Sequence, residues 1–252
     1  NEGIHFPNFN NPSLVIKKIL RSSLSDLICK GVSPNYYFIS GSGNKKTFSK
    51  KNLKKISNSL SKEQIKYNIK LCGGDTTFSK NLSFTFIVVG FSKKIIHRNN
   101  VKTNDDIYVT GNLGDSYVGL QILKNKIGCK KSEYKYFTNE FYKPNIQIKL
   151  AKNLQKFANS SIDISDGLFD DLEKLINKQN LNYYIDLNKI PISKSLKLLI
   201  KRLNLPRTEV ISNGDDYQIL FTANKNKSRI IKIISKKLSI KITKIGEILP
   251  SS

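Results

Sequence analysis

The stretch SIDISDGLFDDL, residues 161–172, places four carboxylates within nine positions. Its first four residues are typical of a short strand, with Asp163 set among apolar neighbours. From Leu168 onward, apolar residues recur at helical spacing. The pattern therefore predicts a strand followed by a helix, with Ser165 and Asp166 at the start of that helix.

These carboxylates have two interpretations. In the first, Ser165 or Asp166 caps the helix, and Asp170 pairs with Lys174 four residues later. In the second, Asp163 and Asp166 hold Mg²⁺, a hard cation that prefers oxygen ligands. A lone carboxylate is costly to bury, so the position of Asp163 inside an apolar strand favours the second interpretation.

Strands and helices alternate in the second half of the chain, which predicts a mixed α/β layered domain, whereas the first half has long helices and few strands. The expected helices span 12–31, 48–70, 145–158, 193–203 and 226–237, with another after the turn that follows 107–111. The expected strands span 34–40, 82–91, 107–111, 161–164, 182–187, 217–222 and 239–248. We place a domain boundary near residue 104, where turn residues cluster. This gives an N-terminal α+β domain at 1–104 and a mixed α/β domain at 105–252.

The composition fits a globular protein: 252 residues with 38% hydrophobic content allow a sizeable core in one large or two ordinary domains. No apolar run approaches the roughly 18 residues that a membrane span needs. The three cysteines are odd in number and far apart, which excludes a disulfide framework or a zinc motif. We therefore expect a cytoplasmic protein with reduced thiols.

The formal net charge of +24 raises the alternative of a nucleic-acid-binding protein. The basic residues are nearly all lysines, however, and they are spread along every segment instead of forming one block. A solvated, lysine-rich surface explains this distribution better, and we expect no nucleic-acid partner.

Two glycine-containing segments are candidates for phosphate-binding loops. GSGNKKT, residues 41–47, lacks the second glycine of a Walker A loop at the required spacing and is better explained as a polar loop. LCGGDTT, residues 71–77, is also expected to be a loop. Its glycines would let backbone N–H groups approach a phosphate, and Asp75 could hold a metal there, although a simple turn is the alternative.

Three other polar positions are ambiguous on their own. Asp26 lies in the first predicted helix, where a solvated pair with Lys30 is the simpler interpretation. NGDDYQILF, residues 213–221, puts two acids before an apolar strand, as a hairpin turn would. His5 and His97 are the only histidines, and each is more often a structural or surface residue than a catalyst.

Taken in order, EGIHF, SDL, GGDTT, YVTGNLGDS, IDISDGL and GDDYQILFT resemble the thiamine-monophosphate kinases. Those enzymes belong to the ATP-binding superfamily that includes aminoimidazole ribonucleotide synthetase. The resemblance covers about residues 2–248. It implies phosphorylation of thiamine monophosphate by ATP through direct in-line transfer, an N-terminal ATP-binding domain, and a homodimer that pairs through this domain.

The resemblance also implies roles for particular residues, with no covalent nucleophile among them. The Mg²⁺ ligands it implies are Asp26, Asp75, Asp163 and Asp166. The ATP contacts it implies are Gly74, Asp75, Arg98 and Ser165, while His5 and Asp215 would face thiamine monophosphate. Asp170 and Asp171 would remain solvated positions on the helix surface.

The chain departs from the family pattern in three ways. An earlier strand, an acidic Gly-Asp-Asp loop and a Thr-Asp pair before EGIHF are missing. The family's substrate-facing glutamate is Asp215 here, and an aromatic residue near the family's C-terminus has no counterpart before Ser252. We therefore expect a chain truncated at both ends. Another enzyme of the superfamily, a ribonucleotide cyclo-ligase or a selenophosphate synthetase, is the alternative, which the SDGL and GDDY motifs disfavour.

Overall fold

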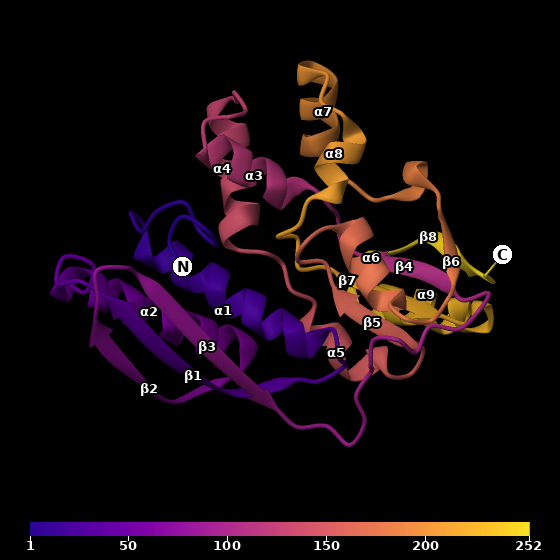
Figure 1. Cartoon of the computed structure of the whole chain (residues 1–252), viewed down its shortest axis with the longest axis horizontal. Helices are drawn as coiled ribbons and strands as arrows, with labels where there is room; N and C mark the ends of the chain where they lie inside the picture. Colours follow the sequence, from indigo (N-terminus) through magenta and orange to yellow (C-terminus); the bar gives the residue numbers. More distant parts are fainter. Residues whose placement is uncertain (252) are drawn as a thin grey trace.

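Two β-sheets organise the protein in this computed structural model, which describes residues 1–251 (Figure 1). The first sheet has the strand order β2-β1-β3, and the second has the order β5-β7-β4-β8-β6. The first sheet and its two helices comprise α1 (Pro12–Ile28), β1 (Pro34–Gly43), α2 (Lys50–Tyr67), β2 (Lys70–Phe78) and β3 (Ser83–Gly90).

The remaining strands are separated by one to three helices each. In chain order they are β4 (Asp106–Thr110), α3 (Asp115–Leu123), α4 (Lys131–Tyr142), α5 (Ile148–Leu154), β5 (Ser160–Asp163), α6 (Leu168–Ile176), β6 (Asn182–Ile185), α7 (Lys194–Leu203), α8 (Arg207–Ser212), β7 (Ile219–Ala223), α9 (Ser228–Leu238) and β8 (Ile242–Leu249). The expected α+β class is thereby confirmed.

Helix α1 begins at Pro12, as its sequence predicts. The side chain of Asn11 accepts a hydrogen bond from the backbone N–H of Leu14, and a proline at the first helical position has no N–H that would need a partner. The helix ends shortly before Gly31, whose φ of +75° lies in the left-handed region that glycine adopts easily. In Figure 1, α1 lies between the first sheet and the rest of the chain.

The prediction of a loop at residues 71–77 is wrong, because this segment is strand β2, paired in parallel with β1. Glycine and aspartate have low intrinsic strand propensity, so pairing with the neighbouring strand determines the structure here. A side chain at Gly74 would lie 1.9 Å from the backbone oxygen of Ile39, so the close approach of β1 requires glycine. Similarly, the first three residues of the predicted polar loop, 41–43, belong to β1.

Every strand pairing in the second sheet is antiparallel. Alternate residues of β7 face opposite sides: Leu220 packs in one hydrophobic cluster, whereas Ile219 and Phe221 pack in another. Strand β4 alternates in the same way, with Tyr108 on the side of Phe221. Both faces are therefore buried, which explains why these strands read as continuous apolar runs in the sequence.

Helices α4 and α8 were not anticipated, and α5 is shorter than the helix predicted at 145–158. Helix α4 is rich in tyrosine and phenylalanine, which favour helices only weakly. It is held by packing: Phe137 and Phe141 are fully buried, and a side chain on Gly119 of α3 would lie 2.2 Å from the backbone oxygen of Phe137. Packing against α3 therefore stabilises α4, although the aromatic residues of α4 have low helix propensity.

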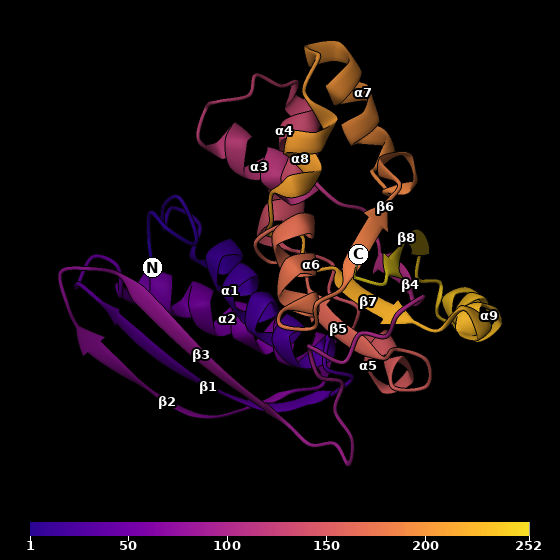
Figure 2. The ribbon, with the colours of Figure 1, turned by 45° about the vertical axis from the view of Figure 1, so that its right-hand side comes forward.

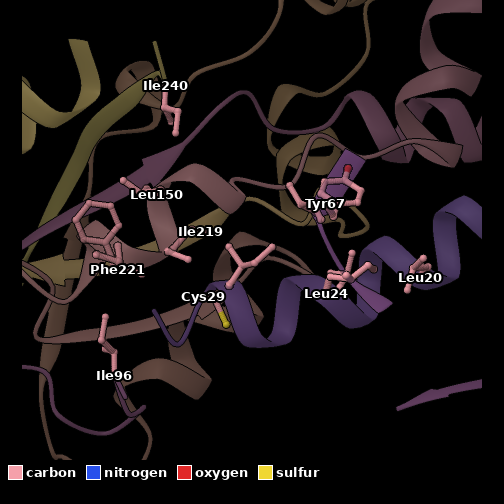
Figure 3. Close-up of a cluster of buried hydrophobic side chains, with 14 of the residues drawn as sticks. Leu20, Leu24, Cys29, Tyr67, Ile96, Leu150, Ile219, Phe221 and Ile240 are labelled. Atoms are coloured by element: carbon pink, nitrogen blue, oxygen red, sulfur yellow. The ribbon is translucent and has the colours of Figure 1, made fainter. Parts of the chain in front are cut away.

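One hydrophobic cluster joins the two sheets through α1 (Figure 3). Leu20 and Leu24 of α1 contribute to it, together with Leu150 of α5 and Phe221 of β7. The domain boundary predicted near residue 104 lies between β3 and β4 and stays a prediction. None of the helices in residues 1–251 is long and apolar enough to span a membrane.

The first sheet is covered on one face by α1 and α2 (Figure 2). On the other face, Phe38 of β1 and Ile87 of β3 lie opposite each other in the strand register and are 41% and 58% exposed. Tyr36, two residues before Phe38 on the same face, is also exposed. We call the residues Tyr36, Phe38 and Ile87 the uncovered face.

Candidate active site

Five segments far apart in the sequence meet around an open pocket of about 680 Å³. They are the stretch before α1, the last turns of α1, one side of α3, the segment after β5 and the segment before β7. We call this the acidic pocket, because four aspartates line it. The lining residues are Ile4, His5, Ser22, Ser23, Asp26, Tyr117, Leu120, Gln121, Lys124, Asp163, Ser165, Asp166, Asn213, Gly214, Asp215 and Tyr217.

Asp26 and Asp163 are electrostatically coupled across the pocket. Desolvation by the surrounding protein, together with the charge of Asp163, raises the pKa of Asp26 to about 6, while Arg98 and Lys30 act in the opposite direction. Asp163 is 3% exposed, and burial raises the pKa of its carboxyl group. Two carboxyl groups whose pKa values are both raised at one pocket form a place where a cation would be stabilised.

The buried thiol of Cys29, at the end of α1, donates to Oδ1 of Asp163 over 3.7 Å. Burial and the charge of Asp163 raise the pKa of this thiol, so it stays protonated and serves as a donor. Strand β5 carries Asp163 at its last position, which fixes the backbone of this carboxylate in the sheet. The strand backbone and the thiol of Cys29 therefore both restrain the Asp163 carboxylate.

The turn between β5 and α6 is organised by a residue that the sequence analysis placed at the helix surface. Oδ2 of Asp171 accepts hydrogen bonds from the backbone N–H groups of Ser165, Asp166 and Gly167 at 2.8, 2.9 and 3.1 Å. Asp171 is 1% exposed, so the expectation of a solvated position is wrong. The helix begins at Leu168, and neither Ser165 nor Asp166 is its N-cap.

Lys174 also differs from its predicted partner. Its ammonium group contacts Oδ1 of Asp171 at 3.0 Å and also bonds Asp166, whereas the pair with Asp170 is not formed. Asp170 is exposed, as predicted. The network of Asp166, Asp171 and Lys174 therefore sets the shape of the turn that carries Ser165.

The segment before β7 lies directly on this turn. The backbone N–H of Asp215 donates to the carbonyl oxygen of Ser165 at 2.9 Å, and that of Tyr217 donates to Ile164 at 2.8 Å. Asp215 and Tyr217 have φ values of +69° and +51°, a strained region for residues other than glycine. A side chain on Gly214 would lie 1.9 Å from the Ser165 oxygen, so glycine permits this contact.

Six of the residues predicted for the site are thus brought together: His5, Asp26, Asp163, Ser165, Asp166 and Asp215. Arg98 does not line the pocket, but its charge acts on Asp26. Gly74 and Asp75 lie elsewhere, on β2, and line a separate and more apolar pocket of about 650 Å³ beside α2. Asp75 is exposed, and its side chain accepts a hydrogen bond from the backbone of Thr76.

Within residues 1–251, no three His, Cys, Asp or Glu side chains are grouped closely enough to hold a metal ion by themselves. The four predicted Mg²⁺ ligands are therefore not assembled as one set, and their role stays a prediction. Mg²⁺ is commonly bound by one or two carboxylates together with substrate phosphates, so the pair of Asp26 and Asp163 fits such an ion chemically.

Two residues at the site were missed by sequence reasoning. Asp171 was assigned to the surface because helical spacing does not reveal a carboxylate that folds back onto the preceding turn. Lys18, buried beneath Asp215, was not noticed among the many lysines of the chain. Its only signal is a lysine between Ile16 and Leu20, two fully buried positions of a helix.

Comparison with known proteins gives a consistent picture. Residues 1–92 match the family model for AIR synthase related protein, N-terminal domain. The chain is 37% identical to the thiamine-monophosphate kinase of Buchnera aphidicola subsp. Acyrthosiphon pisum, over 99% of this chain and 77% of that protein. It is 31% identical to the thiamine-monophosphate kinase of Escherichia coli K12, over 97% of this chain and 75% of that protein.

Solved structures of similar proteins have the same fold as this chain. The structure of AaThiL complexed with AMPPCP and TMP superposes with a TM-score of 0.89 and 26% identity, covering 99% of this chain and 78% of the other. The thiamine-monophosphate kinase of Stenotrophomonas maltophilia K279a superposes with a TM-score of 0.91 and 27% identity, covering 99% of this chain and 80% of the other.

Proposed function

Because this chain belongs to the thiamine-monophosphate kinase family, we propose that it transfers the γ-phosphoryl group of ATP to thiamine monophosphate. The products are thiamine diphosphate and ADP. The observation that carries the proposal is the acidic pocket, where the residues expected to face metal, nucleotide and substrate meet although they are far apart in sequence. The alternatives within the superfamily do not account for the relatives' shared activity.

The reaction joins two anions, so positioning and charge neutralisation carry most of the catalysis. A phosphate oxygen of thiamine monophosphate attacks the γ-phosphorus of ATP. The bond from that phosphorus to the β–γ bridging oxygen then breaks, and ADP leaves with the electron pair. No side chain needs to act as a nucleophile, because the phosphate oxygen of the acceptor attacks directly.

Asp26, Asp163 and Asp166 would hold Mg²⁺, which when bound neutralises phosphate charge and orients donor and acceptor. The raised pKa values of Asp26 and Asp163, which both line the acidic pocket, are the feature of this chain that fits a cation. Arg98, whose charge already acts on Asp26, would contact phosphate oxygens as a fixed guanidinium. Ser165 lies in the turn that Asp171 holds and lines the acidic pocket, and its hydroxyl would bind ATP.

The acceptor side would be bounded by His5 and Asp215. Desolvation lowers the pKa of His5, and the negative charge of Asp215 acts against this change. A carboxylate suits thiamine monophosphate, whose thiazolium ring is cationic and whose pyrimidine carries an amino group. Gly74 and Asp75 are proposed to bind ATP and metal from β2, which is an edge strand with backbone groups free on one side.

The assay for this function follows the products. Full-length protein with thiamine monophosphate, ATP and Mg²⁺ is expected to yield equal amounts of thiamine diphosphate and ADP, separated by chromatography, and chelation of Mg²⁺ should abolish the yield. Phosphorylation of free thiamine but not of its monophosphate would overturn the assignment. ATP turnover that requires a ribonucleotide or selenide would favour the alternatives instead.

We also propose that the protein forms a homodimer through the uncovered face. Tyr36, Phe38 and Ile87 present adjacent apolar side chains to solvent, and β2 leaves an unpaired strand edge beside them. Surfaces of this kind on folded proteins are usually covered by a partner.

We propose a cytoplasmic location as well. Its support is the need for ATP and the presence of three free cysteines, Cys29, Cys72 and Cys129.

Charged substitution of this face tests the dimer. Phe38→Asp combined with Ile87→Asp is expected to convert a dimer to a monomer in sedimentation velocity, because buried carboxylates on two facing copies would repel and lack partners. Ile233→Asp, on α9, is a matched control at another exposed apolar position and should leave the dimer intact. A double variant that stays dimeric would place the interface elsewhere.

A further inference from the structure

Lys18 is a buried cation that contacts Asp215 of the acidic pocket, although it does not itself line the pocket. Its side chain is 3% exposed, and its Nζ lies 2.7 Å from Oδ1 of Asp215. The same ammonium lies 3.8 Å from the ring centroid of Phe141 and 5.4 Å from that of Tyr217. A charge so deeply buried is retained only when it is paired, and Asp215 is its ion-pair partner.

We propose that Lys18 is a positioning residue for substrate recognition: its ammonium group fixes the Asp215 carboxylate so that the second oxygen of that carboxylate faces thiamine monophosphate. The inference rests on the proposed function and extends it to a residue that makes no contact with the substrate.

The two carboxylate oxygens of Asp215 have different hydrogen-bond partners. Oδ1 accepts from both Lys18 and the hydroxyl of Tyr217, at 2.7 and 3.0 Å. Among the hydrogen bonds of residues 1–251, none reaches Oδ2, and the side chain of Asp215 remains 27% exposed at the pocket. One oxygen is therefore anchored in the protein, and the other is available to a ligand.

The backbone makes this anchor necessary. Asp215 and Tyr217 both occupy the left-handed region, and Gly214 lies against the Ser165 turn. A carboxylate on such a strained segment is held in one direction only if its neighbours restrain it. Lys18 supplies this restraint from α1, a helix whose position is itself fixed by the core cluster.

The chemistry matches the substrate class. A carboxylate oxygen with a free lone pair accepts from an amino group or faces a cationic ring, and thiamine monophosphate offers both. The ammonium group of Lys18 partly neutralises the carboxylate of Asp215. The pocket therefore keeps Oδ2 of Asp215 as a hydrogen-bond acceptor with a fixed direction, but without an unpaired negative charge. This arrangement predicts an effect on binding of thiamine monophosphate and not on binding of ATP.

The decisive experiment compares Michaelis constants for the two substrates in full-length protein. Lys18→Met keeps the length of the side chain and removes its charge. It should raise KM for thiamine monophosphate roughly tenfold or more, with KM for ATP within about twofold of wild type. Lys17→Met, at the adjacent and half-exposed position of α1, is the matched control and should change neither constant.

Asp215→Asn is the second variant. It removes the same ion pair at a partly exposed position, and its amide oxygen can still accept a hydrogen bond from Lys18, which limits the cost of leaving that ammonium without a carboxylate. Near-ultraviolet circular dichroism establishes that each variant is folded before its constants are compared. Asp215→Asn should raise KM for thiamine monophosphate by a similar factor, and the double variant should be no worse than either single one, since both remove the same interaction. An unchanged KM in Asp215→Asn, or fully additive effects, would overturn the proposal.

Failure of the proposed function has a different signature. If wild-type protein neither phosphorylates nor binds thiamine monophosphate by calorimetry, the function itself is wrong. If wild type is active but Lys18→Met weakens ATP and thiamine monophosphate equally, the function stands and Lys18 supports the fold only.

Discussion

Asp163→Asn is expected to lower the rate of thiamine monophosphate phosphorylation by at least about a hundredfold while the protein stays folded. The substitution removes one negative charge from the pair that it forms with Asp26. A cation bound there would lose an anionic ligand, and the phosphates of donor and acceptor would be less well neutralised. The shape of the side chain is almost unchanged, so the loss reports on charge.

The same substitution is expected to stabilise the protein in the absence of metal. The pKa values of Asp26 and Asp163 are both raised in the folded state, to about 6 for Asp26. A carboxyl group with a raised pKa binds protons more tightly when folded, so stability is fully present at low pH and is lost as pH rises. For Asp26 this loss falls between its ordinary value of 3.8 and about 6.

Two measurements separate the effects. Steady-state rates with Mg²⁺ give the loss of activity, and urea unfolding with chelator at pH 4 and pH 7.5 gives the stability difference. Wild type should lose more stability than Asp163→Asn across this interval, because the variant removes one ionising group and relieves the other. Asp170→Asn, an exposed position on α6, is the control and should match wild type in both assays. Comparable activity in Asp163→Asn and wild type would exclude Asp163 as a metal ligand.

The sequence predicts most elements of the fold where the local pattern and the tertiary environment agree. Helix α1 is an example, since its apolar spacing, its proline start and its glycine stop all point to the same boundaries. Strand β2 is the opposite case. Its glycines and Asp75 have the composition of a loop, and only the parallel neighbour β1 makes the segment a strand.

The candidate site could likewise be predicted in part from the sequence, while other features of it depend on tertiary contacts. The approach of β5, α1 and the segment before β7 explains why Asp163, Asp26 and Asp215 meet, and their order in the sequence indicated their roles through the family resemblance. The resemblance could not show that Gly74 and Asp75 line a different pocket in one chain. Nor could it show side-chain directions, which depend on buried partners such as Lys18 and Asp171.

Asp171 is the clearest correction, and it leads to a second large effect. Helical spacing placed Asp171 beside Asp170 on a solvated surface, where Asp171→Asn would change little. In the structure, its carboxylate bonds three successive backbone N–H groups and the ammonium of Lys174 while almost fully buried. Removing it leaves three backbone donors without their shared acceptor, and the N–H of Gly167 belongs to a buried residue.

We therefore expect Asp171→Ala to destabilise the protein by about 3 kcal/mol, whereas Asp170→Ala should change the free energy of unfolding by less than about 0.5 kcal/mol. Asp171→Asn should fall between them, because its amide keeps one acceptor oxygen but turns an N–H₂ group toward Lys174. Urea denaturation at neutral pH measures all three differences on a common scale.

The turn held by Asp171 carries Ser165 and Asp166, so its release should also reduce catalysis by more than about tenfold at temperatures where the variant is still folded. Near-ultraviolet circular dichroism would establish that state before rates are compared. If Asp171→Ala were as stable as Asp170→Ala, the three backbone hydrogen bonds would contribute nothing net. If it were unstable but fully active when folded, the turn would keep its shape without its cap, and Ser165 would need another means of support.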